Sequence, residues 1–148
     1  MSEHAQSNYD DSYPSCARTY STLRIFSDNL GPEQITRLLQ VEPTRTFRKG
    51  ELFGKLERKT NGWFYCTQNL TSSKDDRRHL DLIIAALDGK DAQMRELHSH
   101  GCKMDITSFW SSKEGQGGPW LKPEQMLRLG TLGLSLWWDI YFSDEDET

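Results

Sequence analysis

Arg24, Asp105 and Asp139 are the residues of this sequence whose types and predicted placement could do chemistry together. A planar guanidinium pairs well with carboxylates, and two carboxylates at one site could serve as an acid and a base. An arginine between them would keep both carboxylates ionised, however, so neither could act as the acid. The three residues therefore indicate a binding site more strongly than a reaction centre.

A second group of residues has the types of metal ligands. His98, His100 and Cys102 occupy alternate positions, and imidazole and thiolate groups bind zinc. The sequence has no second cluster of such residues, and a histidine near the end of a helix is also favoured electrostatically. We therefore expect no metal and no cofactor.

The motifs of nucleophilic and phosphate chemistry are absent from the sequence. No Gly-x-Ser-x-Gly segment occurs, and Cys66 stands among aromatic residues, where a cysteine is usually inert packing. The Gly-rich segment 115–119 lacks the lysine and the hydroxyl residue of a phosphate-binding loop. The sequence leaves enzymatic activity uncertain and favours a protein that is not an enzyme.

Apolar periodicity predicts the elements that must position these side chains. Strands are predicted at 18–27, 62–68, 102–110 and 132–142, and helices at 32–40, 76–87, 91–99 and from Pro123 onward. The segment 43–60 is polar and basic and contains two glycines, which predicts a long loop.

One internal repeat links two of the helices. Residues 30–38, LGPEQITRL, recur at 121–129 as LKPEQMLRL. Convergence on a good helix start explains the repeat as well as a duplication does. Each copy follows one predicted strand and precedes another, so we predict an α+β fold with a four-stranded, mostly antiparallel sheet of ferredoxin-like type. Two strand–helix–strand units would build it, with two helices inserted between the halves and the first strand between the third and the fourth.

The side chains opposite the leucines of these strands form a predicted polar-aromatic face. Its members are Tyr20, Arg24, Phe26, Trp63, Tyr65, Asp105, Phe109, Trp137, Asp139 and Tyr141. Arg24 would lie between Asp105 and Asp139, and arginine and aromatic side chains are enriched where proteins bind partners. The alternative is a second core on this face, because the apolar stripe of the helix at 76–88 must be buried somewhere. The pattern favours this burial.

A basic segment forms a second candidate surface. Arg45, Arg48 and Lys49 could contact an acidic partner or a phosphate, or could belong to an ordinary solvated loop. The net charge of −4 argues against nucleic acid, since proteins that bind phosphate backbones carry basic patches or stripes. We expect a protein partner rather than a nucleic acid.

Length and composition predict one domain. The chain has 148 residues, of which 35% are hydrophobic, and this suffices to bury a core. We expect a disordered N-terminal tail at 1–15, a single α+β domain at 16–142 and an acidic C-terminal tail at 143–148. No apolar signal segment begins the sequence and the three cysteines are an odd number, so we expect a cytoplasmic protein with free thiols and no membrane span.

Several short motifs resemble those of a known family. They are Leu30-x-Pro32 with Ile35-Thr36, Pro43-Thr44, Lys49-Gly50, Trp63 after the basic segment, Leu132-Gly133-Leu134 and Asp139-Ile140-Tyr141. Over residues 20–142 the chain resembles the bacterial domain of unknown function 4279 family. The resemblance implies a compact α+β domain, but it supplies no established activity and transfers no catalytic residue.

These observations favour a non-enzymatic protein-interaction module. An acidic immunity-type protein that masks a basic toxin is one concrete version, and it rests on analogy with other small domains of this sort. The alternative is a small-molecule binding site or a hydrolase centred on Arg24, Asp105 and Asp139. The sequence leaves the oligomeric state open.

Overall fold

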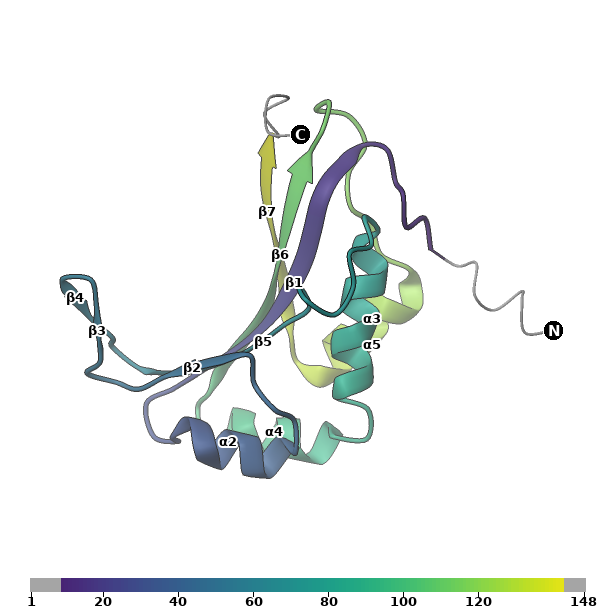
Figure 1. Cartoon of the computed structure of the whole chain (residues 1–148). Coiled ribbons are helices and arrows are strands. Elements are labelled where there is room, and N and C mark those ends of the chain that lie inside the picture. Colours follow the sequence, from purple (N-terminus) through teal and green to yellow (C-terminus); the bar gives the residue numbers. More distant parts are fainter. Residues whose placement is uncertain (1–8, 143–148) are drawn as a thin grey trace.

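A mixed β-sheet with helices on one side forms the body of the molecule (Figure 1). The computed structural model describes residues 9–142. Its elements are β1 (Cys16–Ser27), α2 (Pro32–Leu39), β2 (Arg45–Phe47), β3 (Leu52–Phe53), β4 (Leu56–Glu57), β5 (Asn61–Cys66), α3 (Asp76–Ala86), α4 (Asp91–Ser99), β6 (Lys103–Ser112), α5 (Pro123–Leu132) and β7 (Ser135–Phe142). The predicted loop at 43–60 thus contains three short strands. No helix within residues 9–142 is long and apolar enough to cross a membrane.

Five strands form the main sheet, in the order β2-β5-β1-β6-β7. All neighbours are antiparallel except β6 and β7, which are parallel. The α+β class is confirmed, but the four-stranded ferredoxin-like layout is wrong. β1 lies between β5 and β6, the second and third of the long strands, and the short β2 adds a fifth strand.

The two strand–helix–strand units differ because their connections differ. α5 carries the chain back from the end of β6 to the start of β7, which is the crossover that parallel strands need. After α2 the chain instead runs through β2 and the β3–β4 hairpin and returns along β5, antiparallel to β1. This hairpin, residues 48–60, projects from the sheet, and we call it the arm (Figure 1). The two similar helix starts therefore belong to different topologies.

Glutamine side chains close the starts of both helices of the repeat. The Gly31 backbone N–H donates to Gln34 Oε1 at 2.7 Å, and the Lys122 N–H donates to Gln125 Oε1 at 3.0 Å. Gln34 is exposed, whereas Gln125 is buried and its amide also donates to the Arg77 carbonyl of α3 at 3.0 Å. The second copy of the motif therefore ties two helices together as well as starting one.

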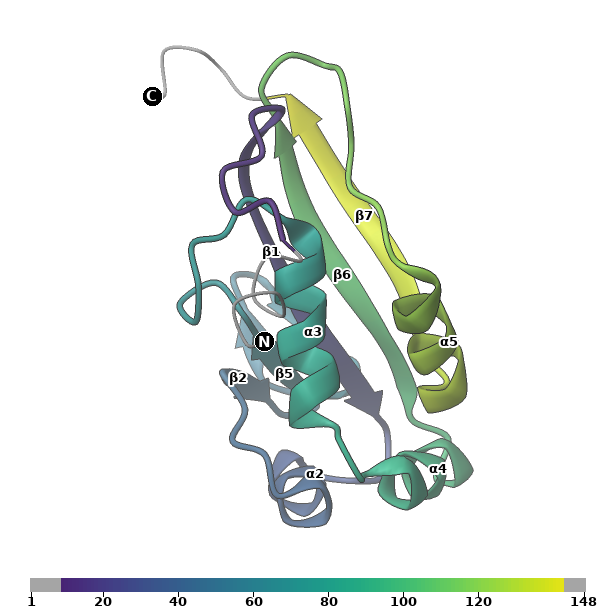
Figure 2. The same ribbon diagram turned by 90° about the vertical axis from the view of Figure 1, so that its right-hand side faces the viewer.

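The hydrophobic core lies between the sheet and the helices (Figure 2). α3 runs along the sheet over β1, α5 lies beside the start of β7, and α2 and α4 close one end. Leu23 and Ile25 of β1 are almost fully buried under this layer. Trp63 of β5 is 0% exposed, and its Nε1–H donates to Thr36 Oγ1 of α2 at 2.9 Å. A single aromatic side chain thus joins the sheet to the end of the helical layer.

A buried carboxyl fixes the start of α3 to the sheet. Asp76 is 2% exposed and accepts hydrogen bonds from Ser21 Oγ of β1 at 3.0 Å and from Trp138 Nε1 of β7 at 2.8 Å. Ser21 Oγ is also 2.6 Å from Ser108 Oγ of β6. Burial raises the pKa of the Asp76 carboxyl, because the charged form loses its hydration. One side chain thereby connects α3 with three strands.

A buried histidine supports the same end of α3. His79 Nε2 is 2.8 Å from the Ser73 carbonyl, to which it must donate, and Nδ1 is 2.6 Å from Thr67 Oγ1. A neutral ring satisfies both contacts, with Nδ1 as the acceptor. Burial lowers the pKa of His79 accordingly. This histidine is a structural residue of the core.

Residues 9–15 contact the start of α3, although their composition predicted a disordered tail. Asp11 forms an ion pair with Arg78 at 2.8 Å and accepts a hydrogen bond from Ser73 Oγ at 2.6 Å. Polar contacts of this kind leave no apolar signal in a sequence, which explains the difference. The remaining parts of the predicted tails, 1–8 and 143–148, lie outside the described residues.

Gly62 of β5 leaves room for the Phe47 ring at the base of the arm. A methyl group on Gly62 would lie 2.2 Å from that ring. We expect Gly62→Ala to lower the free energy of unfolding by about 1–3 kcal/mol, because the ring must leave its place. Urea denaturation measures the change, and Gly118→Ala, whose methyl would meet nothing within 4 Å, is the control. Equal unfolding midpoints for wild type and Gly62→Ala would contradict this packing.

Candidate functional site

One face of the sheet is covered by no helix of the described chain (Figures 1 and 2). The expectation that the helix at 76–88 covers the polar-aromatic side chains is therefore wrong. Leu80, Ile83 and Leu87 of α3 are instead buried in one core with Leu23 and Ile25, because the leucine face of the sheet is the more apolar. We call the uncovered surface the open face. It comprises Arg18, Tyr20, Thr22, Arg24 and Phe26 of β1, Arg45 of β2, Phe64 and Cys66 of β5, Asp105, Thr107 and Phe109 of β6, and Trp137, Asp139 and Tyr141 of β7.

An open depression lies in the middle of this face. Its floor consists of Thr22, Thr107 and Cys66, which are short and lie opposite one another on neighbouring strands. Larger side chains, among them Tyr20 and Phe64, stand around the floor, and the depression encloses about 430 Å³. This volume falls in the range of small-molecule sites, roughly 300–1,000 Å³.

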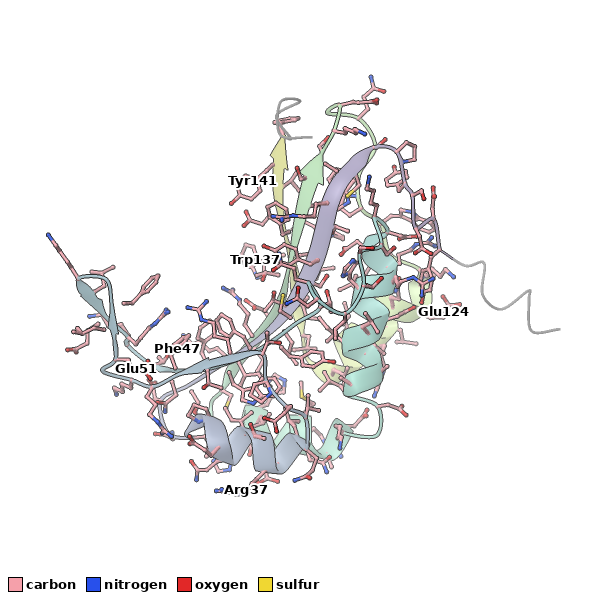
Figure 3. All side chains as sticks on the ribbon, viewed as in Figure 1. Arg37, Phe47, Glu51, Glu124, Trp137 and Tyr141 are labelled. Atoms are coloured by element: carbon pink, nitrogen blue, oxygen red, sulfur yellow. The ribbon has the colours of Figure 1, made fainter. Side chains whose placement is uncertain are left out.

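A row of aromatic rings borders one side of the depression. Tyr20, Phe109 and Tyr141 follow one another across β1, β6 and β7, with ring centroids 5.1 and 5.3 Å apart. The Arg18 guanidinium lies 5.6 Å from the Tyr20 centroid and 5.1 Å from that of Phe109. Figure 3 shows Tyr141 and Trp137 pointing away from α3 and α5. The row therefore presents flat apolar surface to solvent.

A second aromatic group lies where the arm joins the sheet. The rings of Phe26 and Phe47 each meet Phe64 edge-on, with centroids 5.6 Å apart. The Arg45 guanidinium lies 5.6 Å from the Phe64 centroid, and that of Arg58 lies 3.9 Å from the Phe47 centroid. Arginine on an aromatic face gains cation–π attraction and keeps its hydrogen-bond donors free at its edge.

Three of the arginines on or beside the open face have no carboxylate partner. Arg18, Arg45 and Arg58 form no salt bridge with any residue in 9–142, whereas Arg24, Arg48, Arg77, Arg78 and Arg128 each pair with a carboxylate in this range. The carboxylates on this face are Asp105 and Asp139. The open face is therefore net positive, although the whole chain carries a net charge of −4.

Arg24 and Asp105 form a bidentate pair, with Nε and Nη2 each 2.8 Å from a carboxylate oxygen. Asp105 holds the pKa of Arg24 above its ordinary value. Asp139 is not part of this pair, because it lies opposite Phe109 on β6, about 13 Å along the strand from Asp105. It accepts a hydrogen bond from the Tyr141 hydroxyl at 3.1 Å. The structure thus pairs Arg24 with Asp105 and sets Asp139 apart from this pair, although Arg24 and Asp139 both line the depression.

Trp63 and Tyr65 do not lie on the open face, so their predicted placement is wrong. Arg24 is paired in register with Phe64, which turns Phe64 and Cys66 outward and the other two side chains inward. Trp63 is fully buried, and Tyr65 packs partly against the core. The segment NGWFYC is apolar on both faces, so alternation alone does not reveal which residues point outward.

Of the three predicted basic residues, Arg45 alone borders the depression. Arg48 forms an ion pair with Glu33 of α2, and Lys49 is exposed at the base of the arm. Sequence reasoning missed Arg58, whose position in a presumed loop gave no signal. It also missed Arg18, which strand alternation could have found, because Arg18 lies two residues from Tyr20 and six from Arg24.

The predicted metal-ligand residues do not come together in the described part of the chain, and two of the three cysteines are buried. No group of three or more His, Cys, Asp or Glu side chains in 9–142 lies close enough to hold a metal ion. His98 Nε2 lies 3.3 Å from the Leu132 carbonyl, His100 is exposed and Cys102 is buried. All three cysteines are free, and burial raises the pKa of Cys102 and takes that of Cys16 to about 11, which disfavours the reactive thiolate.

Residues 17–143 match the family described as Domain of unknown function (DUF4279). The chain belongs to this family, and the resemblance of the short motifs is confirmed. No curated protein and no solved structure matches the chain significantly. The description of the family names no activity, so the open face has to supply the functional inference.

Proposed function

We propose that this chain is a non-enzymatic interaction module whose open face binds an acidic segment of a partner protein. The observation that carries the proposal is the set of guanidinium groups of Arg18, Arg45 and Arg58, which lie on aromatic rings and have no carboxylate partner within residues 9–142. The fixed edge of a guanidinium binds a carboxylate with two parallel hydrogen bonds.

The aromatic rings add apolar contact to this charge. Trp137 and Tyr141 are 62% and 50% exposed, and their rings bury much area at little cost in side-chain entropy. A segment that alternates acidic and apolar residues would contact the rings and the guanidinium groups together. Aromatic and arginine side chains are also those that most often dominate the binding energy of protein interfaces.

The sign of the charge supports an acidic partner over a basic one. Arg24 neutralises Asp105, which leaves Asp139 as the one carboxylate of the open face that does not bind an arginine. The version in which the chain masks a basic toxin therefore has no support on this face. A hydrolase centred on Arg24, Asp105 and Asp139 has none either, because both oxygens of Asp105 are bonded to Arg24.

A second candidate function rests on the depression. Its volume of about 430 Å³, its aromatic walls and its polar floor suit a small planar anion bound between Phe64 and Phe109, with Arg45 at the rim. Such a ligand and an acidic segment share their chemistry. They differ in reach, because the small ligand would touch Thr22 and Thr107 but not Trp137.

Titration with a labelled peptide tests the main proposal. We expect a fluorescein-labelled, glutamate-rich peptide with two tyrosines to bind, and Arg45→Ala to weaken binding by about threefold to tenfold. Raising the salt concentration should weaken it further, because exposed charges are screened. Fluorescence polarisation gives the affinity, and two-dimensional amide NMR locates the contact.

The matched control is Arg37→Ala, an exposed arginine of α2 on the opposite side of the sheet (Figure 3). It should leave the affinity unchanged. A lysine-rich peptide with the same two tyrosines should not bind. Equal affinity for both peptides, or amide shifts confined to α2 and α4, would overturn the proposal. Shifts confined to Thr22, Cys66 and Thr107 would favour the small-ligand candidate instead.

A further inference from the structure

The last strand of the sheet leaves one backbone edge unpaired. β7 hydrogen-bonds to β6 alone among the described strands. Apolar side chains project from both of its faces: Trp137 and Tyr141 are 62% and 50% exposed on the open face, and Ile140 and Phe142 are 54% and 78% exposed on the other. Proteins usually protect such an edge with lysine, proline or a bulge, and β7 has none of these.

The opposite edge of the sheet looks different. β2 is three residues long, and it carries the charged Arg45 before the chain leaves the sheet for the arm. Short edges discourage pairing with another chain. Of the two edges of the described sheet, β7 is the one that combines length, unpaired backbone groups and apolar side chains, so it is the edge suited to pairing.

We propose that β7 pairs with β7 of a second copy of this chain, antiparallel and across a two-fold axis perpendicular to the sheet. Two five-stranded sheets would then join into one, with both helical layers on the same side. This inference goes beyond the proposed function and does not rest on it, although a joined sheet would also extend the open face across both copies.

The position of α5 along β7 favours a second copy of this chain as the binding partner of the strand. α5 lies beside the first half of β7 and leaves the second half without a helix above it (Figure 2). Its own outer side exposes Met126 and Leu127, at 55% and 73%. The connection 113–122 follows the second half of β7 (Figure 2), and its Gly115 lies beside the Phe142 ring, yet Ile140 and Phe142 stay 54% and 78% exposed. In an antiparallel pair these two side chains of one copy come beneath α5 of the other. The apolar surface of one half of the strand is thereby complementary to that of the other half.

The charge of Asp139 selects the register. Two antiparallel registers overlap β7 with itself best, one with Asp139 opposite itself and one with Trp138 opposite itself. The first places two carboxylates side by side, which is unfavourable. The second places Trp137 opposite Asp139 and Leu136 opposite Ile140, and so it keeps side chains of the same face together. We therefore assign Trp138 to the two-fold axis.

The exposed apolar area suffices for a stable contact. Trp137, Trp138, Ile140, Tyr141 and Phe142 are between 37% and 78% exposed. With about 200 Å² for each large side chain, they offer about 560 Å² per copy, and Met126 and Leu127 of α5 bring this to about 820 Å². A standard interface buries about 800 Å² per partner, and a monomer seldom exposes so large an apolar patch without use.

Sedimentation equilibrium of the full chain tests the pairing. We expect the wild type to be a dimer at micromolar concentrations, and Ile140→Lys to raise the dimer dissociation constant at least tenfold, since an edge lysine opposes strand pairing. Leu56→Lys, on the exposed arm, is the matched control and should leave the constant unchanged. A wild-type chain that stays monomeric overturns the proposal and leaves this edge to a strand of another protein.

Cross-linking tests the register. Residues directly opposite one another in an antiparallel pair have Cα atoms about 4.5–5.5 Å apart, within reach of a disulfide. In a Cys66→Ser background, Trp138→Cys should form a disulfide dimer under a mild oxidant. Trp138 also donates to Asp76, so Trp138→Cys could destabilise the protein. A second pair of variants keeps this tryptophan: Leu136→Cys mixed with Ile140→Cys should cross-link, and neither variant should cross-link alone. Cross-linking of Ile140→Cys with itself would contradict the register.

Failure of this proposal can be told apart from failure of the proposed function. The Ile140 side chain lies on the helical side of β7, away from the open face. The monomeric Ile140→Lys chain should therefore still bind the acidic peptide. Arg45→Ala, in turn, should weaken peptide binding and leave the dimer dissociation constant unchanged.

Discussion

Replacing Trp63 with alanine is expected to lower the free energy of unfolding by about 3–5 kcal/mol. Trp63 is 0% exposed and is among the largest fully buried side chains of the described chain. Its removal leaves a cavity between β5 and the helices and leaves Thr36 Oγ1 without its donor. Guanidinium denaturation, monitored by far-UV circular dichroism, gives the change from the shift of the midpoint.

Two further variants separate burial from hydrogen bonding at this site. Trp63→Phe keeps most of the ring volume but loses the Nε1–H bond, so it should cost about 1–2 kcal/mol. Trp120→Ala removes a tryptophan that is 54% exposed and should cost less than about 1 kcal/mol. Equal losses for Trp63→Ala and Trp120→Ala would contradict the assignment of Trp63 to the core.

Replacing Asp76 with alanine is expected to cost about 3 kcal/mol, because it removes the acceptor of one buried and one part-buried donor and leaves a space in the core. These donors are Ser21 Oγ and Trp138 Nε1. Asp76→Asn can still accept from the indole and donate to a serine oxygen, so it should lose much less. Asp28→Ala, at an exposed position, is the control and should stay within about 0.5 kcal/mol of the wild type.

The dependence on pH provides a sharper test of Asp76. Burial raises its pKa, so the folded protein favours the protonated form. Its contribution to stability is therefore full below about pH 4, the ordinary value for aspartate, and is lost as the pH rises through the raised pKa. Asp76→Asn stays neutral, so its stability relative to the wild type should increase from acid to neutral pH. His79, whose pKa burial lowers, is present in both proteins, and it interacts electrostatically with Asp76.

A constant difference between Asp76→Asn and the wild type across this range would contradict the prediction. It would mean that the Asp76 carboxyl has the same pKa in the folded and the unfolded protein, because its two donors and its place at the start of α3 offset the effect of burial. Chemical denaturation at a series of pH values, with the same buffers for both proteins, distinguishes the two outcomes.

Helix starts could be predicted from the sequence because their signals are local. Pro32 and Pro123 each open a helix, and the structure begins α2 and α5 at these residues. The helix α3 was also predicted, but the pattern pointed to Ser73 as the residue that opens it, whereas Asp75 caps it by accepting from the Arg77 N–H at 3.0 Å. Each of these signals needs contacts within a few residues only, so no knowledge of the tertiary structure is required.

Strand order could be predicted only in part because it depends on contacts between distant residues. The strands predicted at 18–27 and 102–110 are neighbours, as β1 and β6, but the last strand was placed beside the first one, and its parallel pairing with β6 was not predicted. The side that α3 covers was missed for a similar reason. Its stripe at Leu80, Ile83 and Leu87 fits any apolar surface, and the face with Leu23 and Ile25 was available.

The candidate site was predicted where strands alternate cleanly and missed where they do not. Alternation along β7 places Trp137, Asp139 and Tyr141 on the outer side, opposite Thr107, Phe109 and Ser111 in register. In β5 every side chain from Trp63 to Tyr65 is aromatic, so no alternation of apolar and polar residues shows which of them face outward. The charge of the face was missed as well, because Arg18, Arg45 and Arg58 come from two different strands, β1 and β2, and from the arm.

The position of β1 in the sheet has a consequence for folding. It is the first strand of the described chain and also the central one. Leu23 is paired with Ile106 of β6, which lies about 80 residues further along the chain. Closing so long a loop costs entropy before any contact is gained, so β1 can pair with β5 well before it pairs with β6. The helical layer over Leu23 and Ile25 is complete only after α3 and α5 have been synthesised, and we expect the late pairing of β1 with β6 to slow folding.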